Sequence, residues 1–115
     1  MTKRKQLPPT ELMAADSLNP ALANPAVARC CEAWKRVCDA ELQSGTHHVV
    51  AEYEANKIFR YTMPPLTSQQ NIADYIACVA YGIAIGAINQ QDGTRLLYAA
   101  QVAISALRRQ TNPSA

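Results

Sequence analysis

The sequence predicts an all-α protein, a small bundle of four main helices arranged as two helical hairpins. Hydrophobic residues make up 49% of the 115 residues, and alanine, the strongest helix former, is abundant. Apolar residues recur at spacings of three and four, and no segment alternates in the way that strands do. Prolines, glycines and capping residues divide the chain into pieces of helical length.

Residues 1–23 have the character of an N-terminal arm. Three prolines interrupt this stretch, and Lys3, Arg4 and Lys5 form a basic cluster near its start. We expect weak order here unless the arm docks on a partner. The helical domain is predicted to cover residues 24–110, followed by a frayed end at 111–115.

The first long helix is predicted to begin at Asn24, a good N-cap, with Pro25 at the first helical position. Its apolar residues recur at spacings of 4, 3, 4 and 4, which makes one helical stripe. They are Val27, Cys31, Trp34, Cys38 and Leu42. Ser44 and Gly45 are expected to end the helix.

A second helix is expected from His47 to about Tyr61, capped by Thr46. Its periodicity is poorer than that of the first helix, with a broad apolar side. Two prolines after Met63 should stop it, because the residue before a proline is pushed out of helical geometry.

The third helix is expected over residues 70–88, with Thr67 and Gln70 fitting a capping box. After Asp74 the segment is apolar or small almost all the way round. The run from Tyr75 to Ile88 has 14 residues, fewer than the roughly 20 needed to span a bilayer. It therefore predicts a buried core helix and no membrane span.

Cys78, Gly82 and Gly86 lie four residues apart, so they would form one stripe of small side chains on the third helix. Two glycines on one stripe predict that another backbone approaches closely. Either the fourth helix or a second subunit could supply it. A helix that is apolar all round also needs cover on all sides, which favours self-association, most simply as a symmetric dimer.

The fourth helix is expected from about Gly93 to Arg109, after a turn in which Asp92 is the likeliest cap. Leu96, Ala100 and Leu107 belong to its main apolar stripe. Arg108, beside Arg109, falls in the last turn, where cations suit the helix dipole.

The cysteines and histidines are the residues that could carry metal or redox chemistry, but their spacing favours a structural role. Cys31 and Cys38 are two helical turns apart, about 10 Å along the axis, which is too far for one tetrahedral zinc ion. We expect the cysteines, which also include Cys30, to be buried, inert thiols. His47 and His48 are expected to be an exposed pair. No metal, no cofactor and no enzyme activity is predicted, since no known catalytic motif is present.

Four polar residues lie within the apolar runs of the third and fourth helices: Asp74, Tyr75, Tyr98 and Gln101. Each could be a core residue whose polar atom finds one partner. If they converge, they would line a small polar pocket for a nucleotide or metabolite. A contact of Asp74 with Arg60 or Arg95 is a further possibility.

Residues 63–109 contain the sequences YIAC and LLYAAQ on their two helices. This segment resembles a group of small all-helical bacterial proteins with a [YF]-I-A-C helix followed by an L-L-Y-A-A-Q helix. The resemblance covers less than half the chain. It implies a bacterial protein and suggests carriage on mobile DNA, and it brings no activity or functional residue with it.

The near-balanced formal charge of +2 indicates no general affinity for nucleic acid or membranes. Without a secretory signal after the basic start, a cytoplasmic location is expected. The predicted function is a non-enzymatic helical interaction module, a homodimer or the partner of another protein. The alternatives are a nucleic-acid-binding accessory that uses the basic arm and a small-ligand binder.

Overall fold

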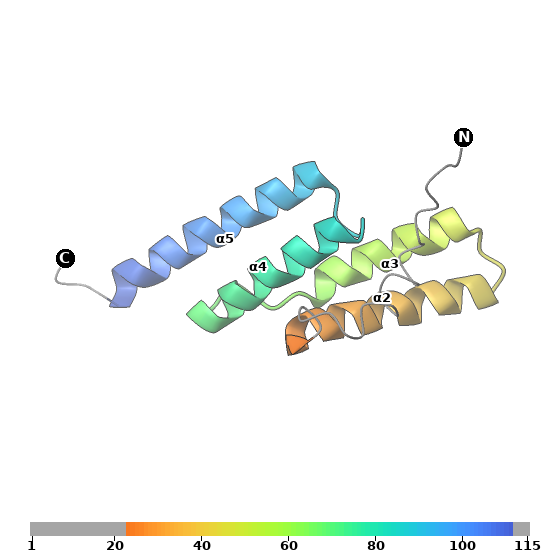
Figure 1. The fold of residues 1–115 in the computed structure, drawn as a ribbon, viewed down its shortest axis with the longest axis horizontal. Helices are drawn as coiled ribbons and strands as arrows, with labels where there is room; N and C mark the ends of the chain where they lie inside the picture. Colours follow the sequence, from red (N-terminus) through yellow and green to blue (C-terminus); the bar gives the residue numbers. More distant parts are fainter. Residues whose placement is uncertain (1–22, 112–115) are drawn as a thin grey trace, which may run out of the picture.

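The computed structural model describes residues 23–111, which form four α-helices and contain no strand. They are α2 (Pro25–Gln43), α3 (His48–Thr62), α4 (Gln69–Ala84) and α5 (Gln90–Thr111), labelled as in Figure 1. The predicted all-α fold is confirmed. The arm expected at residues 1–23 lies outside the described residues apart from Ala23. None of the described helices combines the length and hydropathy needed to cross a bilayer.

The helices form two antiparallel hairpins, α2 with α3 and α4 with α5 (Figure 1). The hairpins meet mainly where α4 packs on α2. Trp34 of α2 and Phe59 of α3 are both fully buried in the shared core, together with Cys78 of α4. The core is thus centred on the first hairpin, and α4 closes it.

The helices begin close to the predicted places, although the caps of α3, α4 and α5 differ from those expected. Asn24 caps α2 as expected, because its Oδ1 accepts hydrogen bonds from the next backbone N–H groups. The cap of α3 is His47, whose Nδ1 accepts from Val49 N at 3.2 Å. Thr46, the expected cap, instead donates to Glu41 Oε2 at 2.8 Å, so its hydroxyl is engaged by the preceding helix.

Helix α4 also starts one residue away from the predicted cap. Ser68 Oγ accepts from Asn71 N at 3.1 Å, whereas Thr67 Oγ1 accepts from the side-chain amide of Asn71. Both hydroxyls therefore hold the first turn through the same asparagine. The capping box expected between Thr67 and Gln70 is not the cap that forms.

The expected third helix, over residues 70–88, is shorter than the sequence suggested, because α4 ends at Ala84. Gly86 has a φ of 81°, the left-handed conformation that terminates helices and suits glycine. The chain then folds back, and Ile88 N donates to Gly82 O at 3.0 Å. Gly86 is thus a turn residue rather than the end of a helical stripe.

The fourth helix begins earlier than expected, at Gln90. Asn89 Oδ1 accepts from Asp92 N at 2.8 Å, in the manner of an N-cap. Asp92, the expected cap, therefore lies inside the first turn, where a carboxylate is stabilised by the helix dipole.

The close neighbours of Cys78 and Gly82 come from the same chain. Cys78 lies against Cys30 of α2. A Cβ added to Gly82 would lie 2.7 Å from Ile88 Cδ1 and 3.0 Å from Phe59 Cε1. The small side chains on this side of α4 allow it to pack closely on the first hairpin and on its own following turn.

The outer side of the second hairpin is covered much less well. Four residues of α4 at spacings of 3, 4 and 4 are exposed, and all are apolar. They are Ala73, Ile76, Ala80 and Ala84. Along the described part of α5, only Gly93 and Ala100 are buried. The described chain therefore leaves an apolar row of α4 open to solvent and α5 only partly covered.

Candidate functional site

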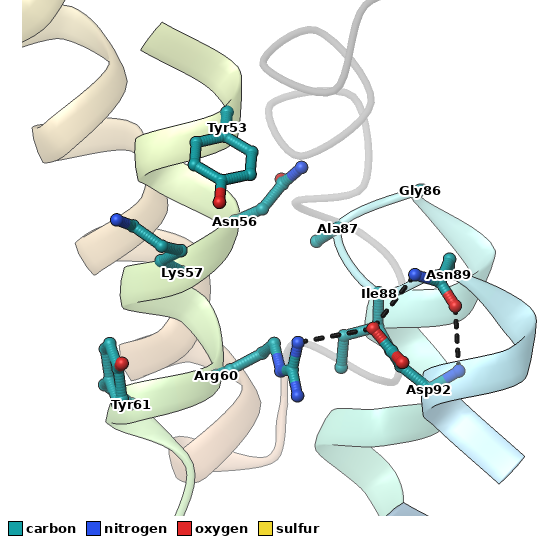
Figure 2. Close-up of a pocket in the computed structure, with 10 residues that line it drawn as sticks. All are labelled: Tyr53, Asn56, Lys57, Arg60, Tyr61, Gly86, Ala87, Ile88, Asn89 and Asp92. Carbon is teal, nitrogen blue, oxygen red and sulfur yellow. Dashed lines mark hydrogen bonds and ion pairs between the residues drawn. The ribbon is translucent and has the colours of Figure 1, made fainter. Parts of the chain in front are cut away.

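A pocket of about 480 Å³ opens between α3 and the turn that joins α4 to α5 (Figure 2). We call it the α3–turn pocket. One wall consists of α3 side chains between Tyr53 and Tyr61, and the other consists of residues 86–89 with the first turn of α5. Its volume lies within the range of about 300–1,000 Å³ that is typical of small-molecule sites.

The α3 wall follows from helical spacing. Tyr53, Lys57 and Tyr61 are four residues apart, so they form one row along the helix, with Arg60 beside them. Phe59 and Ala55 lie on the opposite side of α3 and are fully buried, which turns this row outward. The tyrosines are 60% and 81% exposed, respectively. The wall therefore presents two aromatic rings with cations between them.

The opposite wall is formed by the glycine turn. Because Gly86 adopts a left-handed conformation, the backbone passes the pocket at Ala87 and returns into the core at Ile88, which is buried. Asn89 and Asp92 then bring two polar side chains to the same edge (Figure 2). Asn89 Nδ2 donates to Asp92 Oδ2 at 2.9 Å.

An ion pair joins the two walls. Arg60 Nη1 lies 3.4 Å from Asp92 Oδ2, and Arg95 lies 4.0 Å from the other carboxylate oxygen (Figure 2 shows the contact to Arg60). On α3, Lys57 Nζ lies 3.3 Å from Glu54 Oε2 and 5.2 Å from the Tyr53 ring centre. All these groups are partly exposed, so each pair contributes less than about 1 kcal/mol to stability.

Asn56 connects the pocket to the core. Trp34 Nε1 donates to Asn56 Oδ1 at 2.8 Å, and the indole itself is fully buried. The same side chain lines the α3–turn pocket. The position of this wall is thereby fixed by the largest residue of the core.

The four residues expected to line a polar pocket do not line this one. Asp74 Oδ1 accepts from Asn24 Nδ2 at 3.1 Å and from Gln70 Nε2 at 3.0 Å, which ties α4 to the start of α2. Tyr75 is half-buried, and burial raises the pKa of its hydroxyl. Tyr98 is 67% exposed, and Gln101 is exposed as well. Arg60 and Arg95 form ion pairs with Asp92 and not with Asp74.

All four cysteines are buried, and two of them touch. Cys30 Sγ donates to Cys78 Sγ at 3.8 Å between α2 and α4. This hydrogen bond raises the pKa of the Cys30 thiol, and burial raises it further. The same bond lowers the pKa of Cys78, because it stabilises a thiolate there. Both side chains are fully enclosed, so the contact belongs to the core.

Native protein is expected to react slowly with a thiol reagent such as 5,5′-dithiobis(2-nitrobenzoate), because all four thiols are buried. Denaturant should release all four groups, and the labelling rate should rise with the unfolded fraction. Mass spectrometry of partly labelled protein provides the measurement. A thiol that reacts in the folded protein at the rate of a free cysteine would contradict this arrangement.

The other candidate groups show no metal-binding geometry within the described residues. No group of three His, Cys, Asp or Glu side chains converges there. His47 and His48 lie with their rings 4.4 Å apart, and His47 serves as the cap of α3. Lys3, Arg4 and Lys5 lie outside the described residues.

Sequence reasoning missed the α3–turn pocket, although part of its signal was present. The spacing of Tyr53, Lys57 and Tyr61 marks an exposed aromatic and basic row on α3. The second wall depends on where α4 stops, and that was placed four residues too late. Comparison of the chain with protein-family models, with curated proteins and with solved structures finds no match.

Proposed function

We propose that this protein is a non-enzymatic helical interaction module that acts in the cytoplasm by protein–protein contacts and pairs with a second copy of itself. The interface consists of α4 and α5. The supporting observation is the exposed apolar row of α4, together with the half-buried aliphatic residues of α5, which the described chain leaves without full cover.

The α4 part of this surface is unusually apolar for a solvent-facing helix. Ile76 is 40% exposed, and its neighbours in the exposed row, Ala73 and Ala80, are both small and apolar. A typical surface helix carries charged or polar residues on its outer side. Asp74 is the only charged residue of α4, and it is occupied by Asn24 and Gln70. The small alanines would let another helix approach closely.

Helix α5 supports the same proposal, because it packs mainly on α4. Its Leu97, Ile104 and Leu107 are only half-buried, and Val102 is 49% exposed. A large aliphatic side chain gains about 1.5–3 kcal/mol on going from full exposure to full burial, so each of these residues gains part of that amount from further cover.

A second copy is the occupant that fits best. In a symmetric dimer the same surface of each subunit forms the interface, so a charged group near the axis lies close to the identical group of the partner. The exposed row of α4 carries no charge, so self-pairing meets no repulsion there. Two α4–α5 hairpins packed face to face would also complete a four-helix bundle, the usual way of burying such sides.

Sedimentation equilibrium of the full chain at tens of micromolar should give twice the 12.5 kDa of the protomer. Ala80→Glu should shift the dissociation constant upward by at least tenfold, because it places a charge on the paired surface. Ala40→Glu, at an exposed alanine of α2, is the matched control and should leave the dimer intact.

Circular dichroism distinguishes a lost interface from a lost fold, since Ala80→Glu should retain its helical content. A wild-type protein that stays monomeric at these concentrations would refute the proposal. So would a dimer that responds equally to Ala40→Glu and Ala80→Glu.

A further inference from the structure

We propose that the α3–turn pocket binds a small organic anion that carries an aromatic ring, a ligand of about the size of a nucleoside monophosphate. This site is separate from the α4–α5 surface proposed above for self-association. The proposal rests on the pocket's shape, on its charge and on the order of the groups along α3.

Positive charge prevails in the pocket. Its lining includes Lys57 and Arg60 as cations and Asp92 as the one acid, a formal balance of +1. The first turn of α5 adds the partial positive charge of a helix N-terminus at the same edge. These features together favour an anion.

The two cations keep donor groups available for such an anion. Arg60 makes one contact of 3.4 Å to Asp92, and a guanidinium has five N–H donors. Lys57 is paired with Glu54, which does not line the pocket. An anionic ligand could therefore contact both cations while these ion pairs persist.

The aromatic preference comes from the tyrosines. Tyr53 and Tyr61 are eight residues apart on α3, about 12 Å along the helix axis. Lys57 and Arg60 lie between them. If the aromatic ring of a ligand stacks on either tyrosine, a short linker is enough to bring the anionic group of the same ligand to Lys57 or Arg60. Ala87 and Ile88 on the facing wall add apolar contact for a planar group.

The ion pair across the pocket permits a test in which two substitutions should change the affinity for an anion in opposite directions. In Arg60→Gln the pocket loses a cation, whereas in Asp92→Asn it loses the competing anion. Both substitutions break the same pair. Asn has the size of Asp, and Gln is a shorter, uncharged polar replacement for Arg. Asp92→Asn should therefore bind an anion more tightly than wild type, and Arg60→Gln should bind it more weakly.

Titration calorimetry of the full chain with adenosine 5′-monophosphate and with indole-3-acetate should detect binding. These two probes distinguish a phosphate from a carboxylate as the preferred anion. Adenosine, which lacks the charge, and inorganic phosphate, which lacks the ring, should each bind at least tenfold more weakly than the preferred probe. Backbone amide shifts in a nitrogen–proton correlation spectrum should centre on residues 86–89.

We expect Arg60→Gln to lower the affinity for the preferred probe at least tenfold and Asp92→Asn to raise that affinity several-fold. Arg36→Gln, an exposed arginine of α2, is the matched control and should change nothing. Equal losses in Arg60→Gln and Asp92→Asn would show a structural effect and overturn the proposal. So would the absence of binding by both probes at millimolar concentration, or affinity that grows with the length of an oligonucleotide.

Discussion

Replacing Trp34 by alanine is expected to lower the free energy of unfolding by about 3–5 kcal/mol. The indole is fully buried between the hairpins and is the largest side chain of the core. Its removal leaves a cavity that the helices around it cannot close. Since a small domain has roughly 5–15 kcal/mol of stability in total, the variant should be close to unfolding at room temperature.

Urea denaturation followed by circular dichroism measures this loss. Tyr61→Ala is the matched control, because its ring is 81% exposed and its loss should cost less than about 0.5 kcal/mol. A loss below about 1 kcal/mol for Trp34→Ala would contradict the described core.

The hydrogen bond from Trp34 to Asn56 can be tested within the same series. Asn56→Leu leaves the buried indole N–H without a partner, at an expected cost of about 1–3 kcal/mol. In a Trp34→Phe background this donor no longer exists, so the same substitution should cost less. A double-mutant cycle with no coupling would argue against the 2.8 Å bond.

Gly82→Ala is expected to destabilise the protein by about 1–3 kcal/mol, although alanine is the better helix former. The new methyl would lie 2.7 Å from Ile88 Cδ1 and 3.0 Å from Phe59 Cε1, and both side chains are buried. Ile88 must therefore shift to admit the methyl, and Phe59 leaves little room beside it. Thermal and urea unfolding should therefore show a loss in place of the roughly 1 kcal/mol gain expected from helix propensity.

A second substitution tests the cause of this loss. Ile88→Val removes the Cδ1 atom that lies nearest to the added methyl, and by itself it should cost about 0.5–1.5 kcal/mol. Combined with Gly82→Ala, it should relieve part of the overlap, so the double variant should be more stable than the sum predicts. Strict additivity would mean that Ile88 is not the obstacle.

Much of the fold could be predicted from local chemistry. Asn24 and Pro25 specify the start of α2, and Gly45, with a φ of 89°, follows its C-terminal cap and turns the chain toward α3. The apolar stripe through Trp34 and Cys38 identified the buried side of α2, although Leu42 at its end is 44% exposed. Such signals act within a few residues, so the sequence alone displays them.

The candidate site was harder to predict, because its walls come from segments that are distant in sequence. Arg60 and Asp92 are 32 residues apart, and nothing in either neighbourhood indicates the other. The polar pocket expected around Asp74 and Tyr98 was predicted only because these polar residues lie within apolar runs of the sequence. Helical phase places Tyr98 outward, while Asp74 holds Asn24.

Local signals account for the number of helices in the described chain and for their approximate limits, because capping, proline and periodicity are local properties. The way the helices pack places Gly86 in a turn, brings Gly82 against Phe59 and leaves α5 half-covered. These outcomes depend on how the hairpins dock. Docking is a balance of contacts between distant residues, which no single segment encodes.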